Sequence, residues 1–427
     1  MNNFKDFITD FIRVGEYDQK TLLKAKRLWS KKYKKMLPRN SDIYRAYQTL
    51  VRAKPGIKSE KLAELLHIRK VRTISGVAPV AVLTKPFPCP GKCIYCPVQT
   101  DMPKSYLNDE PAVMRAVDSG FDPYLQVQKR LAQYLATGHT PEKIELIVMG
   151  GSFSALPDVY KFYFIRRLFE ACNDFPRTKK SRQKLLSQEN KQLLAAQRKN
   201  ETSKYRVVGL TLETRPDLIN KREIKLMRRL GCTRVEIGVQ STDDRVLKTI
   251  KRGHGTLSTI KATGLLKDNG FKVCYHMMPN LPGSSQGIDL AMFKKIYSDE
   301  KYMPDMVKIY PCVVTRSTGL FHLYKQGKYR SYTDKELIEL MIKIKQTTPR
   351  WVRINRLYRD IPAINIVSGS KTSNLRQVLQ NRMIKAGKKC QCIRCREAGY
   401  KKFKIKNLKL KILSTEPAGE KSISWNI

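Results

Sequence analysis

The sequence lacks any long apolar run and any uninterrupted apolar N-terminus. Its longest apolar stretch, Val77–Leu83, is far shorter than the roughly 20 residues that a membrane-spanning helix needs, and it contains Pro79. The first residues carry Lys5, Asp6 and Asp10, where a signal peptide has a continuous apolar core. We therefore expect a cytoplasmic protein without a membrane partner.

The sequence is also poor in acidic residues. Its 427 residues include 83 Lys and Arg but only 37 Asp and Glu, which gives a formal net charge of +46. The 41% hydrophobic content is enough for packed cores and excludes wholesale disorder. Because the basic excess is spread along the whole chain, it favours a polyanionic partner, above all a nucleic acid, over an ordinary solvated surface.

The ten cysteines are unevenly distributed, which argues against disulfides. Three lie at positions 89, 93 and 96, and three more at 390, 392 and 395. Tight clusters in a long cytosolic chain indicate metal binding. Cys172, Cys232 and Cys274 are isolated and are expected to be buried core thiols.

Residues 1–70 predict a basic helical module, with apolar residues at helical spacing and no strand signal. Residues 71–320 alternate short β-rich runs with amphipathic segments, which predicts an α/β fold with a parallel sheet or partial barrel. Ligands of such folds bind at the carboxyl ends of the strands. The six runs are Val77–Leu83, Ile144–Met149, Val207–Leu212, Arg234–Val239, Phe271–Met277 and Met306–Tyr310.

Three segments depart from this alternation. Residues 174–205 are rich in polar residues and predict an exposed insertion, partly helical over 184–197. Residues 321–400 predict a mixed linker region with a strand at 351–359 and the second cysteine cluster. Residues 401–427 contain two strand-like runs.

The first cysteine cluster, Cys89-Pro-Gly-Lys-Cys93-Ile-Tyr-Cys96, follows the first predicted strand directly. Three thiolates on one short loop bind three irons of a cubane and leave the fourth iron open to a small molecule. A structural zinc is the alternative, but it needs a fourth ligand nearby, and the next His or Cys along the chain is His139.

This spacing resembles the radical S-adenosylmethionine (SAM) superfamily, and further motifs resemble the Elongator complex protein 3 family, which modifies the wobble uridine of tRNA. The similarity runs from about residue 54 to residue 400. Its motifs are Asn108–Arg115, Phe121–Tyr124, Val148–Phe153, Glu213–Asp217, Arg234–Gln240, Arg252–His254, His276–Pro279, Lys308–Pro311 and Tyr358–Pro362.

The resemblance implies a radical SAM partial (β/α)6 barrel with a basic helical N-terminal module and a small zinc-stapled α+β C-terminal region. It also implies that Cys89, Cys93 and Cys96 hold a 4Fe–4S cluster and that the open iron binds SAM. The expected reaction forms 5-carboxymethyluridine, with acetyl-CoA as carbon donor and a deoxyadenosyl radical as oxidant. The tRNA anticodon arm is the expected partner, contacted by Lys and Arg of residues 1–70, 174–205 and 385–396.

Residue roles carried over from the resemblance concern the strand ends. Gly150, Gly151 and Ser152 would border the methionine part of SAM, and Glu213 and Gln240 would face the same mouth. Lys143 would contact acetyl-CoA, and Lys308 and Tyr310 would line the substrate channel as catalytic residues. Strand-end packing or a solvated charge is the alternative for each, and His254 and His276 are interpreted as hydrogen-bonded structural residues.

The second cluster offers three soft ligands within six residues, Cys390, Cys392 and Cys395. With Cys312 as a fourth ligand, tetrahedral zinc would staple the C-terminal region to the barrel rim. Reduced free thiols are the alternative.

Family members continue into a C-terminal acetyltransferase domain, and residues 401–427 hold at most a strand-like remnant of one, without its Gly-containing turn. Use of acetyl-CoA is therefore in question. Three alternatives follow: a different carbon donor, a separate polypeptide carrying the acetyltransferase lobe, or a catalytically idle tRNA-binding subunit. A second copy of this chain is a further partner to consider.

Overall fold

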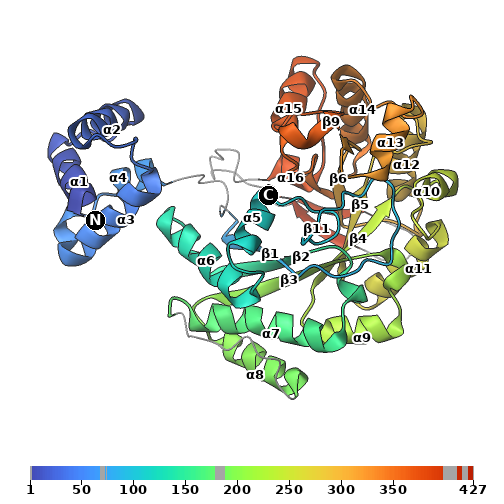
Figure 1. Cartoon of the computed structure of the whole chain (residues 1–427), viewed down its shortest axis with the longest axis horizontal. Coiled ribbons are helices and arrows are strands. Elements are labelled where there is room, and N and C mark those ends of the chain that lie inside the picture. Colours follow the sequence, from blue (N-terminus) through green and yellow to red (C-terminus); the bar gives the residue numbers. More distant parts are fainter. Residues whose placement is uncertain are drawn as a thin grey trace.

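The structure, a computed structural model, describes residues 2–67, 73, 75–177 and 188–397, together with the backbone of 411–415 and 422–426. Its N-terminal part consists of four helices with a core of their own (Figure 1). Leu22, Ile43 and Leu62 are among the side chains buried there. This segment is helical, as its apolar spacing predicts. The helices are α1 (Asn2–Val14), α2 (Gln19–Tyr33), α3 (Asn40–Ala53) and α4 (Glu60–Leu66).

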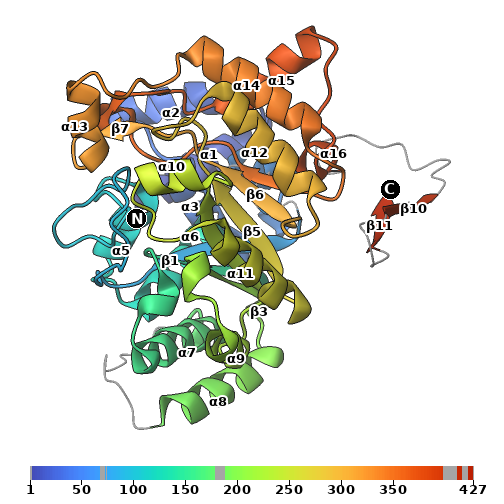
Figure 2. The ribbon, with the colours of Figure 1, turned by 90° about the vertical axis from the view of Figure 1, so that its right-hand side faces the viewer.

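A seven-stranded parallel sheet forms the centre of the molecule (Figure 2). The six strands predicted from the β-rich runs are adjacent in sequence order, each paired in parallel with the next, which confirms the α/β half-barrel class. The strands are β1 (Val77–Leu83), β2 (Lys143–Met149), β3 (Arg206–Thr214), β4 (Arg234–Gln240), β5 (Lys272–Met277), β6 (Met306–Ile309) and β8 (Arg353–Arg356).

The seventh strand, β8, lies within the strand that we predict at 351–359, in the mixed linker region beyond residue 320. It pairs with β6 in parallel, with Arg353 opposite Met306. The sheet therefore extends further along the chain than the six β-rich runs indicate. Pro79 is tolerated in β1 because this strand has a single neighbour, so the missing backbone donor interrupts no second ladder.

Helices pack on the outer face of the sheet and connect its strands (Figures 1 and 2). The segment 111–136 forms two helices instead of one, because the chain turns at Gly120 and Phe121, both with positive φ. The helices are α5 (Pro111–Val117), α6 (Pro123–Ala136), α7 (Asp158–Asp174), α8 (Glu189–Glu201), α9 (Lys221–Arg229), α10 (Asp244–Thr249), α11 (Thr256–Asp268), α12 (Gln286–Ser298), α13 (Gly319–Lys325), α14 (Asp334–Thr347), α15 (Leu375–Lys385) and α16 (Ile393–Arg396).

Two small antiparallel pairs complete the described strands. One joins β7 (Val314–Thr315) to β9 (Ile366–Ser368), and the other joins β10 (Lys411–Thr415) to β11 (Ser422–Asn426). The second pair lies where we predict two strand-like runs. Among the residues that the structure describes, no helix is both long and apolar enough to cross a membrane.

Helix α8 falls within the segment that we interpreted as an exposed insertion. The helix packs on α7 with Leu193 and Ala196 buried, and Arg166 donates two hydrogen bonds to Glu189 at 2.6 and 3.1 Å. This segment, although polar in composition, therefore contributes one apolar helix face and a buried ion pair to the fold. Residues 178–187 of the predicted insertion lie outside the described residues.

The sheet does not close into a full barrel, because β1 and β8 pair with one neighbour each. Side chains span the opening between the segments that follow these two strands. Arg359 donates to the Ser105 hydroxyl at 2.8 Å and lies 3.4 Å from a Glu110 oxygen, and Asn365 donates to Asp109 at 2.7 Å. We call these contacts the clasp.

Candidate functional site

The cysteine loop, residues 89–96, lies at the carboxyl end of the sheet, directly after β1. Its backbone is fixed by Ile94, which donates to the Ile250 carbonyl at 3.1 Å and accepts from Leu320 at 2.8 Å. Ile94 and Tyr95 pack against an apolar cluster that includes Val246 and Leu320. The loop is therefore held at the mouth of the half-barrel by elements far away in the sequence.

The three thiols of this loop have different surroundings. Cys93 Sγ accepts a hydrogen bond from Arg252 Nη1 at 3.3 Å, and Cys89 Sγ lies 3.9 Å from Ser152 Oγ. Burial raises the pKa of Cys96 to about 11, and the nearby Cys93 adds to this shift. In the described structure the three Sγ atoms do not all lie within 4.8 Å of one another. A single ion needs such convergence, whereas in a cubane each thiolate binds a different iron.

Several buried polar atoms around this mouth have no hydrogen-bond partner among the described residues. Buried polar groups in native structures almost always have a partner, so a concentration of unpaired ones marks a place for a polar ligand. Both donors and acceptors are present, as the amino, carboxylate and hydroxyl groups of SAM require. The atoms are Thr84 Oγ1, Thr214 Oγ1, Arg215 Nη1, Gln240 Oε1, Arg252 Nε and His254 Nε2.

The turn after β2 brings backbone close to this space. Gly150 and Gly151 have φ values of +126° and +99°, in the region that favours glycine. A Cβ on Gly150 would overlap Thr84 Oγ1 and lie 3.2 Å from the Thr84 nitrogen. Gly150 therefore lets the turn after β2 pass directly against Thr84, where a Cβ would clash.

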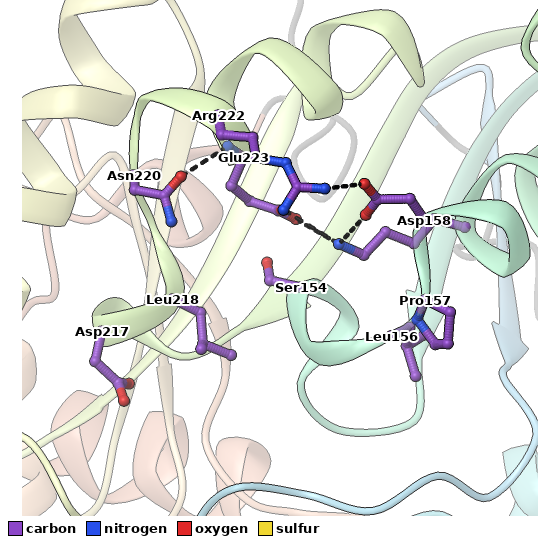
Figure 3. Close-up of a pocket in the computed structure, with 10 residues that line it drawn as sticks. Ser154, Leu156, Pro157, Asp158, Asp217, Leu218, Asn220, Arg222 and Glu223 are labelled. Carbon is purple, nitrogen blue, oxygen red and sulfur yellow. Dashed lines mark hydrogen bonds and ion pairs between the residues drawn. The ribbon is translucent and has the colours of Figure 1, made fainter.

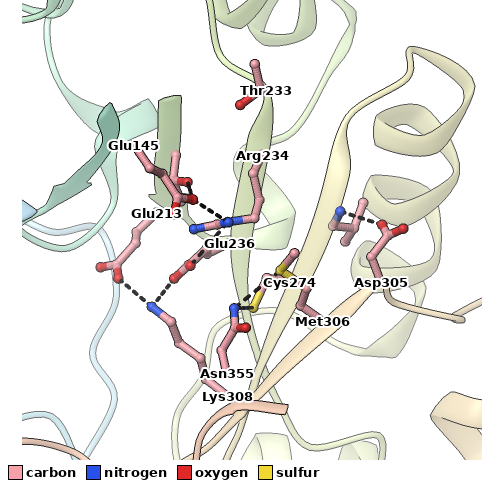
Figure 4. A network of polar contacts seen from close by, with 12 residues as sticks. Glu145, Glu213, Thr233, Arg234, Glu236, Cys274, Asp305, Met306, Lys308 and Asn355 are labelled. Atoms are coloured by element: carbon pink, nitrogen blue, oxygen red, sulfur yellow. Dashed lines mark hydrogen bonds and ion pairs between the residues drawn. The ribbon is translucent and has the colours of Figure 1, made fainter. Parts of the chain in front are cut away.

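A network of buried charges crosses the inside of the half-barrel below the mouth (Figure 4). The Lys308 ammonium contacts a Glu236 oxygen closely and lies 3.5 Å from Glu213 Oε1. His276 Nε2 lies 2.8 Å from the same Glu236 oxygen, and the Tyr106 hydroxyl donates to Glu213 at 2.9 Å. The network thus joins residues of β3, β4, β5 and β6.

The charges in this network stabilise one another. Burial opposes the charged form of Glu236, but Lys308 and His276 outweigh it and hold the pKa of Glu236 well below its usual range. Burial likewise opposes the charge of Lys308, yet Glu236 holds its pKa above the usual value. Glu213, Glu236 and His276 have ligand atoms close enough for a metal ion, but the Lys308 ammonium already contacts both carboxylates. We conclude that the network holds a proton-bearing lysine.

Two further predicted residues reach the same region. Tyr310 follows β6, and its ring lies edge-on to His276 with centroids 5.4 Å apart. Gln240 ends β4 with a positive φ of +71°, and its carbonyl accepts from Met278. The carboxyl-terminal parts of β2, β3, β4 and β6, with the residues that follow them, therefore contribute predicted residues to one mouth.

Known protein families match most of this barrel. Residues 88–287 match the radical SAM superfamily, and residues 304–385 match its C-terminal domain. The chain is 48% identical to tRNA uridine(34) acetyltransferase of Methanocaldococcus infernus over 349 residues. This alignment covers 80% of this chain and 63% of that protein. It is 38% identical to human Elongator complex protein 3 over 83% of this chain and 64% of that protein.

A solved structure agrees in fold as well as in sequence. It is the archaeal Elp3 of Methanocaldococcus infernus with an N-terminal deletion. The two chains are 43% identical with a TM-score of 0.66, and the match covers 80% of this chain and 71% of that one. The chain belongs to the Elongator complex protein 3 family. It spans just under two thirds of the length of the two curated relatives named above. The radical SAM domain of this family implies a 4Fe–4S cluster and SAM, and the cysteine loop offers the donor set for them.

The second cysteine cluster of this family member lies away from the mouth. The sulfur atoms of Cys390, Cys392 and Cys395 all lie within 4.8 Å of one another, and Lys345 Nζ donates to Cys395 Sγ at 3.4 Å. Tetrahedral zinc with Zn–S bonds of about 2.3 Å brings its thiolates to this range. These three residues are thus placed as a zinc site requires.

The prediction that Cys312 completes this set is wrong. Cys312 is buried with Val314, Leu320 and Tyr329 in a different apolar cluster, and it is absent from the group of converging sulfur atoms. Burial raises its pKa to about 12. The strand end that carries Cys312 turns toward the loop side of the mouth, whereas Cys392 packs beside β8, where Ile393 donates to the Val352 carbonyl. Cys312 therefore does not meet Cys390, Cys392 and Cys395, although the order of the strands suggested that it would.

Lys143 is not brought to the mouth either. It is the exposed first residue of β2 and pairs with Val77 and Arg206, at the amino-terminal edge of the sheet. Sequence reasoning also missed two members of the site. Glu236 lies in the middle of β4, where sequence alone suggests that an acidic side chain faces solvent. Arg252 contacts Cys93, which is 159 residues away in the sequence. The Arg252–His254 motif was the available signal for the latter.

A pocket of about 500 Å³ lies between the starts of α7 and α9, lined by the segments that follow β2 and β3 (Figure 3). The buried ammonium of Lys161 lies 3.1 Å from Glu223 and 3.3 Å from Asp158, and Arg222 also donates to Asp158. Because these charges neutralise one another, the pocket belongs to the packing between the two helices. One lining atom, Ser154 Oγ, is buried without a hydrogen-bond partner among the described residues.

Proposed function

We propose that this chain is a radical SAM enzyme that modifies the wobble uridine of tRNA to 5-carboxymethyluridine, with acetyl-CoA as carbon donor. The observation that carries the proposal is the convergence at one mouth of the cysteine loop, the glycine turn after β2 and the buried Lys308 network. The names of the relatives, tRNA uridine(34) acetyltransferase and Elongator complex protein 3, support the substrate.

In this proposal Cys89, Cys93 and Cys96 hold a 4Fe–4S cluster, which when bound supplies the electron that cleaves SAM to a deoxyadenosyl radical. Gly150 and Gly151 leave room for SAM beside the loop, and Ser152 lies next to Cys89. Glu213 and Gln240 offer acceptor oxygens at the same mouth. The half-barrel excludes water from the reacting groups.

Lys308 and Tyr310 are proposed to act on the acetyl donor and the uridine. The Lys308 ammonium is kept charged by Glu236 and Glu213, so it can stabilise negative charge that develops on a thioester or uracil oxygen. The Tyr310 hydroxyl stays protonated because burial raises its pKa, so it can donate a hydrogen bond. Both groups are fixed in place before the substrate arrives.

The carbon donor has an alternative to acetyl-CoA. Lys143, the residue proposed for acetyl-CoA, lies at the amino-terminal edge of the sheet, away from the mouth. A different carbon donor, or an acetyltransferase lobe on a separate polypeptide, is therefore the second candidate. A tRNA-binding subunit without activity is the third.

The net charge of +46 supports tRNA as the partner. Helix α2 carries six Lys and Arg residues, and Lys24, Lys31 and Lys32 are exposed among them. We propose that the anticodon arm contacts this module and that affinity falls steeply with salt. We also propose zinc at Cys390, Cys392 and Cys395, in a structural role.

An anaerobic assay tests the function. The reconstituted protein is incubated with SAM, a reductant, tRNA and acetyl-CoA, and deoxyadenosine is quantified with each of the last two omitted in turn. Cleavage that needs both, together with carboxymethyluridine in the tRNA, is the expected result. Cleavage that ignores acetyl-CoA favours another donor or a separate lobe. Binding of tRNA without any cleavage of SAM contradicts the enzymatic proposal.

A Cys93→Ala variant provides the control for the cluster. It should fold and bind tRNA but cleave no SAM. A Cys172→Ala variant, in which an isolated buried thiol of the same barrel is removed, should retain cleavage. Tenfold or greater activity of Cys93→Ala above background would contradict the proposed role of the loop.

A further inference from the structure

Two buried arginines lie beside the cysteine loop and are not used by the reaction proposed above. Arg252 is 6% exposed and Arg215 is 4% exposed. Arg252 follows α10, and Arg215 follows β3, so each reaches the loop from a different part of the barrel. Buried cations require partners, and the partners of these two residues indicate their purpose.

Arg252 contacts a thiol of the loop directly. Its Nη1 donates to Cys93 Sγ at 3.3 Å, and its Nη2 donates to the Gly238 carbonyl on β4. Gly238 is needed for this approach, because a Cβ there would lie 2.7 Å from Arg252 Nη2. The guanidinium is therefore clamped between the sheet and one sulfur atom.

Arg215 supports this arrangement from the other side. It forms a two-point ion pair with Asp217 at 2.9 and 3.0 Å, and its Nη2 donates to the Arg252 carbonyl at 2.9 Å. Its Nη1 is buried without a partner among the described residues and points at Gly91 of the loop, where a Cβ would overlap it. Two guanidinium groups, with one carboxylate between them, thus place a net positive charge against the loop.

We propose that Arg252, positioned by Arg215, tunes the reduction potential of an iron–sulfur cluster on this loop and makes its one-electron reduction easier. Reduction adds one negative charge, which a hydrogen bond to the ligand sulfur and a nearby buried cation both stabilise. Arg252 is thus a positioning residue that acts through Cys93. The inference rests on the proposed cluster-binding role of the loop, and it is independent of tRNA and of the carbon donor.

An EPR-monitored potentiometric titration of the anaerobically reconstituted full chain tests this inference, with no SAM, tRNA or acetyl-CoA present. Wild type is compared with Arg252→Gln at equal iron content. We expect the ratio of reduced to oxidised cluster at a given potential to fall about tenfold or more, which for one electron is a shift of about 59 mV to lower potential. An unchanged potential in Arg252→Gln overturns the inference.

Two further variants make the result specific. Arg245→Gln removes a cation from α10 of the same segment, but that side chain is 86% exposed and paired with Asp243, so its potential should equal that of wild type. Gly238→Ala retains the charge of Arg252 but displaces its guanidinium, and it should lower the potential in the same direction as Arg252→Gln. This second variant decides the question if Arg252→Gln fails to take up iron.

The outcomes separate this inference from the proposed function. If wild type takes up no iron, the cluster assignment fails and the inference fails with it. If the cluster forms and Arg245→Gln shifts the potential as much as Arg252→Gln, general charge explains the effect and the contact with Cys93 does not. A shift confined to Arg252→Gln and Gly238→Ala supports the inference.

Discussion

Replacing Glu236 with Gln tests how the buried charges inside the half-barrel are held. Glu236 is 1% exposed and lies against Lys308, His276 and, at 3.7 Å, Arg234. The variant keeps the volume and shape of the side chain but removes its charge. Lys308 then retains Glu213 at 3.5 Å as its nearest carboxylate.

The expected cost follows from this geometry. Two unit charges about 4 Å apart interact by about 4 kcal/mol at an effective dielectric constant of about 20. Removing one partner of a buried ion pair typically costs about 3–5 kcal/mol, because the other charge stays buried. Since Glu213 still neutralises Lys308 in part, we expect a loss of about 3 kcal/mol in the free energy of unfolding. Urea denaturation of the metal-free protein, followed by circular dichroism, measures it.

A double-mutant cycle supplies the test of the reasoning. Lys308→Met alone should be similarly costly, whereas the double variant should cost less than the sum, with a coupling energy of about 1–3 kcal/mol. Asp360→Asn is the control, since it breaks an ion pair to Arg356 that is nearly half exposed on both sides, and it should cost less than about 1 kcal/mol. Strictly additive losses, or a Glu236→Gln variant as stable as wild type, would refute the account.

The same variant should change the response to acid. Burial opposes ionisation of Glu236, but Lys308 and His276 hold its pKa well below the value of about 4.3 in an unfolded chain. Its contribution to stability is therefore complete above about pH 5 and is lost as the pH falls through the lower pKa of the folded state. Wild type should lose stability more steeply below pH 5 than Glu236→Gln, and equal slopes would argue against the depressed pKa.

Three further outcomes are expected. Gly150→Ala should weaken SAM binding to the reconstituted protein at least tenfold, because a Cβ would overlap Thr84. Gly264→Ala, where a Cβ meets open space, should leave SAM binding unchanged. Equal dissociation constants for the two variants would contradict a role of the glycine turn in SAM binding. Cys392→Ser should abolish bound zinc in elemental analysis without changing iron content, and zinc retained at the wild-type level would exclude the site. Burial and the nearby Arg252 lower the pKa of His254 to about 4, so an NMR titration should show a neutral ring down to about pH 5. The contribution of the neutral ring to stability is complete above the unfolded-chain pKa of about 6.5 and is lost as the pH falls below it. A titration midpoint near the unfolded-chain pKa would contradict this.

The strands of the barrel are predictable from the sequence because their signal is local. Val77–Leu83 is predicted and observed with identical bounds, and the other five β-rich runs differ from the observed strands by a few residues. β-Branched residues bounded by polar turns favour a buried parallel strand wherever they occur. β8 lies within the strand predicted at 351–359, but its place beside β6 in the same sheet depends on tertiary pairing that its short Arg-Ile-Asn-Arg sequence does not encode.

The parts of the site that depend on distant contacts are less accessible to sequence reasoning. The cysteine loop and the glycine turn are continuous motifs, so their chemistry can be read directly. Cys312 was assigned to zinc from strand order, whereas the packing of its side chain with Tyr329 separates it from the other thiols. Burial of Glu236 and the approach of Arg252 to Cys93 depend on which face of a strand turns inward and on which loops meet, and neither is encoded in spacing.

The clasp across the unpaired edges of the sheet determines how the half-barrel can respond to a bulky guest. In a closed barrel, widening the mouth would break a continuous ladder of backbone hydrogen bonds, all at once. Here Arg359 and Asn365 span the gap with a few side-chain hydrogen bonds, each worth about 1 kcal/mol and able to break separately. The width of the mouth at this gap therefore depends on a few separate side-chain contacts, and breaking them would leave every strand pairing of the sheet intact.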